Sequence, residues 1–130
     1  MTLTDASGST VDLSGVETVT GSDGSDSITI NTNDIDSVTG GAGVDTVTLT
    51  ASGSTVALSG VETVTGSSGS DSITINTNDI ESVTGGDGVD TVTLTASGST
   101  VDLSGVETVT GSSGSDSITI IDDTLSLIHI

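Results

Sequence analysis

Short runs in which an aliphatic residue alternates with a threonine or serine recur along the whole chain. In one such run Val47 and Leu49 fall on one side, and Thr46 and Thr48 fall on the other. A period of two is typical of a β-strand with one face buried and one face in water. Gly, Asn, Asp and Ser gather between the runs, and such clusters favour turns. The pattern therefore predicts an all-β chain of short strands joined by tight turns.

The runs belong to a long internal repeat. A segment of 45 residues that starts at Ala6 recurs almost unchanged from Ala51, and its first part recurs from Ala96 as far as Ile120. Within it, turns of the form Gly-x-x-Gly-x-Asp follow one another at alternating spacings of 19 and 26 residues, and they begin at Gly21, Gly40, Gly66, Gly85 and Gly111. Repeats of this length bury a continuous core by stacking each unit on the next.

We therefore expect residues 1–124 to form a single parallel β-solenoid, β-roll-like, in which short coils of 19 residues alternate with long coils of 26. Each coil would hold two strands, and Val56 and Leu58 would form a third short strand in the long coils. Aliphatic residues one coil apart would then form two facing internal ladders, namely Ile28, Val47, Ile73, Val92 and Ile118 in one and Val19, Val38, Val64, Val83 and Val109 in the other.

Disorder is the rival interpretation, because Gly, Ser, Thr and Asp dominate the composition and the net charge is high. The strict alternation of β-branched residues argues against a permanently disordered chain. Disorder in the absence of a cation stays open.

The charge of the chain limits its partners. Nineteen acidic residues and no Lys or Arg give a formal net charge of −19. Such a chain does not bind nucleic acid or an anionic membrane surface by charge, and its carboxylates have no internal cation to pair with. No apolar run reaches the roughly 18 residues of a membrane span, so membrane insertion is not expected. Cations must come from the solvent.

The aspartates at position six of the glycine turns are the candidates for cation binding. Stacked in successive coils, they would lie about 4.8 Å apart, and like charges at that distance repel by about 1–3 kcal/mol. Ca²⁺ relieves this repulsion because it accepts several oxygen ligands in flexible geometry, and glycine lets backbone carbonyls turn inward. Mg²⁺ demands a stricter octahedron, and transition metals favour His or Cys. The spacing therefore predicts a calcium ladder along one edge of the solenoid.

Two nonapeptides, "GGAGVDTVT" (40–48) and "GGDGVDTVT" (85–93), fit the pattern G-G-x-G-x-D-x-U-x at every fixed position, where U is a large aliphatic residue. The chain thereby resembles the RTX, or haemolysin-type calcium-binding, repeat family of bacterial proteins exported by type I secretion. The resemblance implies calcium ions between the turns of adjacent coils, bound by the Asp at position six and by backbone carbonyls of the glycine turn. The metal ligands carried over in this way are Asp26, Asp45, Asp71, Asp90 and Asp116, with Gly40, Gly41, Gly43, Gly85, Gly86 and Gly88 in the two complete turns.

The repeats also diverge from the family pattern. The turns that start at residues 21, 66 and 111 carry Ser in place of the second Gly, which can block the backbone conformation that the site requires. A second row of acids lacks the glycine pair altogether, and we interpret it as a solvated edge without calcium; its members are Glu17, Asp36, Glu62, Glu81 and Glu107.

Nothing in the chain predicts an enzyme. Serine is abundant, yet no base stands in a motif beside it, and the lone His129 lies outside the repeat. A structural role is expected instead. Two alternatives to calcium binding stay open: a metal-independent solenoid spacer, and an ice-binding surface, because outward ranks of Thr resemble those of ice-binding solenoids.

The last six residues differ from the rest. The hexapeptide "LSLIHI" (125–130) resembles the translation of a transposase adapter used in sequencing libraries, and we expect it not to be biological. Met1 likewise stands where Val47 and Val92 stand in their repeats. We therefore expect a metagenomic fragment of a larger, secreted or cell-surface bacterial protein, an adhesin or an RTX-type exoprotein, with calcium ions and the rest of that parent chain as its partners.

Overall fold

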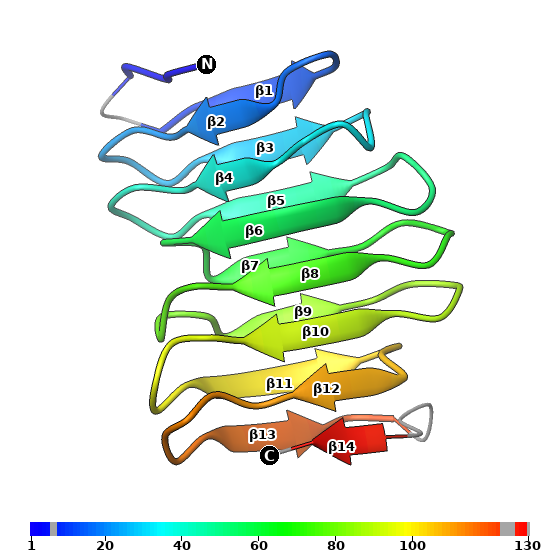
Figure 1. The fold of residues 1–130 in the computed structure, drawn as a ribbon. Helices are drawn as coiled ribbons and strands as arrows, with labels where there is room; N and C mark the ends of the chain where they lie inside the picture. Colours follow the sequence, from blue (N-terminus) through cyan, green and yellow to red (C-terminus); the bar gives the residue numbers. More distant parts are fainter. Residues whose placement is uncertain (6–7, 123–126, 130) are drawn as a thin grey trace.

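The chain forms a stack of flattened β-coils, seen from the side in Figure 1. The computed structural model describes residues 1–5, 8–122 and 127–129. Within these residues every regular element is a strand, and the strands form two seven-stranded parallel sheets, one of odd-numbered and one of even-numbered strands. None of the described residues lies in a helix that is long and apolar enough to cross a membrane.

The strands are short and alternate between the two sheets along the chain. The odd sheet holds β1 (Thr10–Leu13), β3 (Ser27–Ile30), β5 (Thr46–Leu49), β7 (Thr63–Thr65), β9 (Ser82–Thr84), β11 (Thr100–Ser104) and β13 (Ser117–Ile120). The even sheet holds β2 (Thr18–Thr20), β4 (Ser37–Thr39), β6 (Thr55–Ser59), β8 (Ser72–Ile75), β10 (Thr91–Leu94), β12 (Thr108–Thr110) and β14 (Leu127–His129). One odd strand and the next even strand make one coil, so the expected all-β parallel β-solenoid is confirmed.

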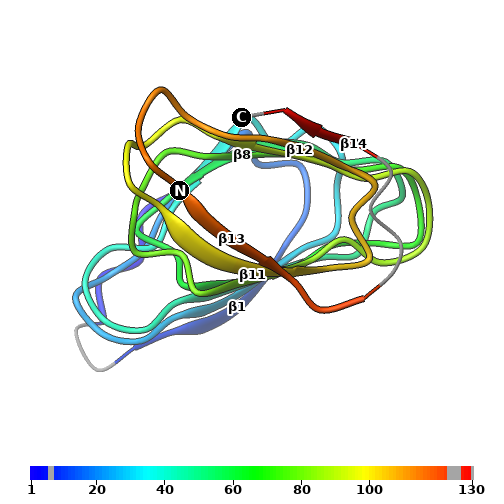
Figure 2. The ribbon, with the colours of Figure 1, turned by 90° about the horizontal axis from the view of Figure 1, so that it is seen from below.

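The two sheets face each other across a single interior, which Figure 2 shows from below. The coils wind in a right-handed sense (Figures 1 and 2), as parallel β-crossovers generally do. Turns that lead from an even strand into an odd strand lie at the left in Figure 1, and we call this side the left edge. Turns that lead from an odd strand into an even strand form the right edge.

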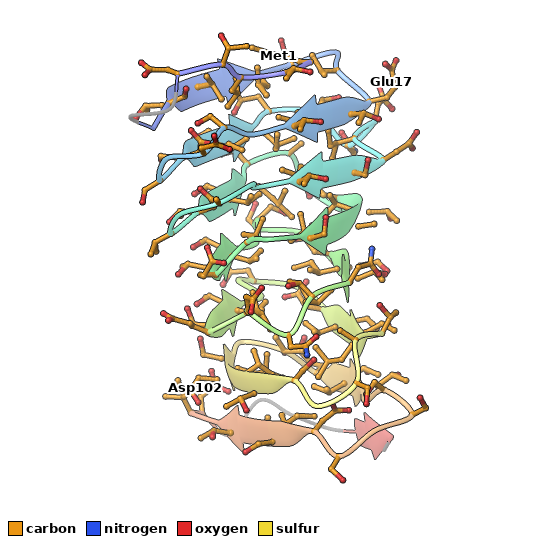
Figure 3. The ribbon with its side chains drawn as sticks, turned by 90° about the vertical axis from the view of Figure 1, so that its left-hand side faces the viewer. Met1, Glu17 and Asp102 are labelled. Carbon is orange, nitrogen blue, oxygen red and sulfur yellow. The ribbon has the colours of Figure 1, made fainter. Side chains whose placement is uncertain are left out.

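The core consists of stacked aliphatic side chains between the sheets. In β8, for example, Ile73 and Ile75 are fully buried while Ser72 and Thr74 face outward, as the period of two predicts. Aliphatic residues from the turns, such as Val61 and Ile80, are buried with them. Figure 3 shows hydrocarbon side chains between the sheets and oxygen atoms on the outer faces. Asp102 of β11 is one of the side chains that point outward. Each buried aliphatic side chain stabilises the fold by about 1.5–3 kcal/mol.

The expected division into coils of 19 and 26 residues is wrong. Residues that pair in adjacent coils are 17 apart between β1 and β3, 19 apart between β3 and β5, and 20 apart between β4 and β6. The segment with Val56 and Leu58 is not a third strand in a long coil, because it forms β6, an ordinary member of the even sheet. The physical reason is the hydrogen-bond ladder: residues 55–59 pair with β4 on one side and β8 on the other, so the residues expected as an addition to a long coil form a strand of the next coil.

One 45-residue repeat therefore contains five strands and covers two and a half coils. The same sequence, Ser-Ile-Thr-Ile, forms β3, β8 and β13, which lie in the odd, the even and again the odd sheet. The two expected ladders mix the sheets for this reason. Four of their pairs do stack, Ile28 with Val47, Ile73 with Val92, Val19 with Val38 and Val64 with Val83, but the expected steps between these pairs are wrong. Val47 does stack on Ile28, but its next neighbour is Val64 rather than Ile73. Equivalent residues of successive repeats lie on opposite sides of the solenoid.

Candidate metal centres

The five aspartates predicted as calcium ligands lie on both edges of the solenoid. Asp26, Asp45 and Asp116 directly precede odd strands and therefore belong to the left edge. Asp71 and Asp90 directly precede even strands and belong to the right edge. The expectation of one ladder along a single edge is therefore wrong, because two and a half coils per repeat alternate the side on which each turn falls.

On the left edge, hydrogen bonds from backbone to side chain join four stacked turns. Ser9 donates its N–H to Asp26 Oδ1 (2.5 Å), and Asp26 donates its N–H to Asp45 Oδ1 (2.7 Å). Asp45 donates its N–H in turn to Glu62 Oε2 (2.6 Å). We call Ser9, Asp26, Asp45 and Glu62 the left column.

The right edge repeats the arrangement one repeat later. Ser54 donates its N–H to Asp71 Oδ1, Asp71 to Asp90 Oδ1, and Asp90 to Glu107 Oε2, all at 2.7 Å. We call Ser54, Asp71, Asp90 and Glu107 the right column. A third column begins at the left edge, where Ser99 donates its N–H to Asp116 Oδ1 (3.0 Å).

The second row of acids does not form an edge of its own, and that part of the interpretation is wrong. Glu17, Asp36 and Glu81 are exposed, as expected of solvated acids, whereas Glu62 and Glu107 are partly buried. Glu62 and Glu81 lie at the left edge, whereas Glu17, Asp36 and Glu107 lie at the right edge. Glu62 and Glu107 each accept a hydrogen bond at the end of a column that contains two aspartates. Carboxylates from both predicted rows therefore lie in the same columns.

The two complete glycine turns, 40–45 and 85–90, have a backbone that only glycine adopts readily. Gly41 and Gly43 have φ of 120° and 126°, and Gly86 and Gly88 have φ of 111° and 130°. No non-glycine residue in the described part of the chain has a positive φ. These turns therefore depend on the second and fourth glycines of the nonapeptide.

The first glycine of each turn lets two oxygen atoms approach its backbone closely. A Cβ on Gly40 would collide with the carbonyl oxygen of Gly60 in the next coil and would lie 2.5 Å from Asp45 Oδ2. A Cβ on Gly85 would likewise collide with the carbonyl oxygen of Gly105 and would lie 2.6 Å from Asp90 Oδ2. In each case a carboxylate oxygen and a backbone carbonyl oxygen lie against the same glycine, where a side chain would otherwise begin.

Asp45 and Asp90 each keep one carboxylate oxygen without a partner. Both residues are 0% exposed. Their Oδ1 atoms accept backbone hydrogen bonds, but Asp45 Oδ2 and Asp90 Oδ2 are buried without any, alone among the side chains that the structure describes. An unpaired buried carboxylate oxygen is costly in a folded protein, so Asp45 Oδ2 and Asp90 Oδ2 are the strongest candidates for metal ligands among the predicted aspartates.

Serine completes the hydrogen bonding of the aspartates in the other glycine turns. The Ser22 N–H donates to Asp26 Oδ2 (2.7 Å), and its Oγ lies 3.0 Å from both carboxylate oxygens. Ser67 makes the same contacts with Asp71, and Ser112 with Asp116. The predicted ligands therefore fall into two groups, one with an open oxygen and one without.

The pKa shifts follow the same division. Burial raises the pKa of Asp45 and of Asp90, and the negative charge of the neighbouring aspartate adds to this, against one lowering backbone hydrogen bond. Burial also acts upward on the pKa of Asp26, but the hydrogen bonds from Ser22 and Ser9 outweigh it and lower this pKa. The hydrogen bond from the Ser112 N–H is the largest cause of the lowered pKa of Asp116.

Asp45 and Asp90, each with a carboxylate oxygen that has no hydrogen-bond partner, fit a hard cation that prefers oxygen ligands. Ca²⁺ takes carboxylate and backbone carbonyl oxygens at about 2.3–2.6 Å and is flexible in geometry. Among the described residues, no group of three or more His, Cys, Asp or Glu side chains is placed to hold a metal. A cation at Asp45 would therefore need backbone carbonyls, and Gly60 O lies against the same glycine, Gly40, as Asp45 Oδ2.

These features define a class: a parallel β-solenoid whose edge turns stack buried carboxylates beside glycine carbonyls. The family model of the RTX calcium-binding nonapeptide repeat matches the chain in four copies, at residues 13–29, 31–51, 56–74 and 103–119. The chain belongs to this family, whose repeats bind calcium. No curated protein and no solved structure matches the chain.

The unmatched stretch 75–102 includes the turn of Asp90. It differs from 30–57, which contains the turn of Asp45, at only three positions: 81, 87 and 102. Both turns also have the same geometry, so the likeness of the Asp45 turn to the family extends to Asp90.

Sequence reasoning missed three kinds of site residue. These are the carbonyls of Gly60 and Gly105, the terminal acids Glu62 and Glu107, and the serines that bind carboxylates. The signal that could have revealed the first two was the odd number of strand runs in each repeat, because it places the Ser-Gly-Val-Glu turn next to the complete glycine turn on the same edge.

Proposed function

We propose that this chain is a calcium-binding structural segment of a larger protein, with a calcium ion at Asp45 on the left edge and another at Asp90 on the right edge. The observation that carries the proposal is the pair of buried carboxylate oxygens that have no hydrogen-bond partner. Each lies against a glycine that lets a carbonyl oxygen of the next coil approach too closely for any side chain. The composition supports it further, because the chain has no Lys or Arg to neutralise these charges.

The proposed ions act as cross-links between coils. Asp45 lies next to Asp26 and Glu62 in the left column, so three carboxylates stack in successive coils. A divalent cation there would reduce their mutual repulsion and hold the glycine turn against the turn of Gly60. Since the ion binds only the folded stack, its binding free energy would stabilise the fold.

The task of the segment within its parent is also a proposal. Repeats of this family typically occur in secreted proteins. We infer a secreted or cell-surface parent, in which the solenoid serves as a spacer or an adhesive stalk that becomes rigid in extracellular calcium. Millimolar calcium outside the cell suits the affinities of about 10⁻⁴–10⁻³ M found in extracellular calcium modules.

An ice-binding surface has less support. The outward positions beside Ser37 and Ser82 are occupied by Ala57 and Asp102, which interrupt the ranks of hydroxyl groups. A regular lattice of hydroxyls is therefore absent from these two places in the described sheets.

Thermal unfolding in calcium and in chelator tests the proposed function. At a calcium concentration 100-fold above the dissociation constant, each occupied site adds about 2.7 kcal/mol to the free energy of unfolding. We expect a higher melting temperature in calcium, and a much smaller response to magnesium. The double variant D45N/D90N should lose the calcium response, while D34N/D79N, which removes the same charge from exposed carboxylates, should keep it. A folded wild-type chain that is indifferent to calcium would instead be a metal-independent spacer.

A further inference from the structure

We propose that Ser22, Ser67 and Ser112 are built-in substitutes for the cation, so that the turns of Asp26, Asp71 and Asp116 hold no calcium. This inference rests on the proposed function and deepens it, because it states which of the five glycine turns take up the ion and which do not.

The two kinds of turn place the same two oxygen atoms against their first glycine. Beside Gly66, a Cβ would lie 2.9 Å from Asp71 Oδ2 and would collide with the carbonyl oxygen of Gly85. Gly21 borders Asp26 Oδ2 and the carbonyl oxygen of Gly40 in the same way. The pairing of one carboxylate oxygen with one carbonyl oxygen is thus common to both kinds of turn. It does not explain why only some carboxylates lack a partner.

The residue at position two makes the difference. In the turn 66–71, the Ser67 N–H donates to Asp71 Oδ2 (2.7 Å), and Ser67 Oγ lies 2.9 Å from Oδ2 and 3.0 Å from Oδ1. Ser67 is only 7% exposed, so these contacts are sheltered from water. In the turn 85–90 the equivalent residue is Gly86, which has no hydroxyl, and Asp90 Oδ2 is without a partner.

The backbone of the two turns differs accordingly. Gly86 and Gly88 have positive φ, whereas Ser67 and Gly69 at the same positions do not. A side chain at position 86 would be strained, and its Cβ would collide with the carbonyl oxygen of Ser67 in the coil before. The serine turn and the glycine turn are therefore complementary neighbours that stack as a pair on each edge.

The pairing sets the expected number of ions. The left column and the right column each contain one serine turn followed by one complete glycine turn, so each of these two columns has one carboxylate oxygen without a partner. In the serine turn, both carboxylate oxygens of the aspartate have hydrogen-bond partners without a metal. The backbone N–H of that aspartate donates to the aspartate of the next coil, as Asp71 N–H does to Asp90 Oδ1 (2.7 Å). The chain should bind two calcium ions rather than one for each glycine turn.

Substitution of Ser67 tests the inference in the full chain. Ser67→Gly frees Asp71 and permits the glycine backbone, so the number of calcium ions bound per chain, measured by titration calorimetry, should rise from two to three. Ser67→Ala is the matched control: it removes the hydroxyl but keeps a side chain, and its count should stay at two. In chelator, Ser67→Ala should have a lower melting temperature than the wild type, because a buried carboxylate loses its hydroxyl partner.

The outcomes separate the two proposals. A wild-type count of four or five, or a folded Ser67→Gly variant that still binds two ions, would overturn the inference and leave the proposed function standing. A wild-type count of zero would overturn the proposed function itself, whereas the loss of stability of Ser67→Ala in chelator would still report the role of the serine. If Ser67→Gly does not fold, Ser22→Gly on the left edge provides the same test.

Discussion

Replacement of Asp90 by Asn should have opposite effects on the calcium-free and the calcium-loaded protein. Asp90 is 0% exposed, its Oδ1 accepts the Asp71 N–H at 2.7 Å, and its Oδ2 has no partner. Asn can keep the first contact through its carbonyl oxygen. Its amide group would replace the unpaired Oδ2 and can donate to the carbonyl oxygen of Gly105, which lies against the same glycine, Gly85.

The magnitudes follow from these contacts. In the absence of calcium, the variant removes a buried charge and gains a hydrogen bond worth about 1 kcal/mol, so the free energy of unfolding should rise by about 1–3 kcal/mol. At calcium 100-fold above the dissociation constant, the variant loses one of two ions and therefore about 2.7 kcal/mol of stabilisation. At about 2.1 cal/mol/K of unfolding entropy per residue, 1 kcal/mol corresponds to roughly 4 °C in this chain.

Paired thermal melts in chelator and in calcium measure both effects on the same samples. The melting temperature of D90N should exceed that of the wild type in chelator, and its increase on adding calcium should be about half as large. The control variant D79N makes the same substitution at an exposed aspartate, and its melting temperature should match that of the wild type in both conditions. A D90N protein that is less stable in chelator and shows an undiminished calcium shift would refute the assignment of Asp90.

Three further predictions concern the turn, the protonation of the columns and the core. Gly85→Ala should destabilise the fold by about 1–3 kcal/mol and remove one calcium ion, because its Cβ would collide with Gly105 O. Gly15→Asn is the control, since a Cβ there meets nothing within 4 Å and Asn tolerates the φ of 64° better than other side chains; it should keep both ions and lose less stability, as calorimetry and melting would show. In calcium-free buffer, the raised pKa values of Asp45 and Asp90 mean that the folded state takes up protons before the unfolded state, so their contribution to stability should increase as the pH falls from 7 towards 3.8, and melting of D45N/D90N should lack that increase. The lowered pKa values of Asp26 and Asp116 act oppositely, since their contribution is lost only as the pH falls below 3.8. Ile73→Ala should cost about 2–5 kcal/mol in denaturant unfolding, whereas Ile121→Ala, at a position 64% exposed, should cost less than about 0.5 kcal/mol.

The strands and their inward faces were predictable from the sequence, because alternation of aliphatic and hydroxyl residues reports burial directly. Val47, Leu49, Ile73 and Ile75 are all buried as the pattern predicts. The coil length was not predictable from glycine spacing alone, because identical turns fall on opposite edges when each repeat contributes five strands. Stacking register depends on pairing between coils, and that information lies outside any single turn.

The candidate site was predictable in part. The aspartates at position six and the glycines at positions one, two and four follow from the nonapeptide, and whether they bind calcium stays a prediction. The distribution of the five aspartates over two edges could not be predicted without knowing the register in which the strands of adjacent coils pair. The role of Ser22 and Ser67 required side-chain geometry, because Ser at position two can either obstruct a metal turn or, as the hydrogen bonds to Asp26 and Asp71 indicate, complete it.

The most direct test of the central claim is a crystal structure of the chain grown in calcium, with anomalous scattering used to locate the ions. The account predicts one ion beside Gly40 and Asp45 on the left edge and one beside Gly85 and Asp90 on the right edge, with none at the turns of Ser22 and Ser67. Ions confined to a single edge, or glycine turns that stay free of metal in a folded solenoid at saturating calcium, would contradict it.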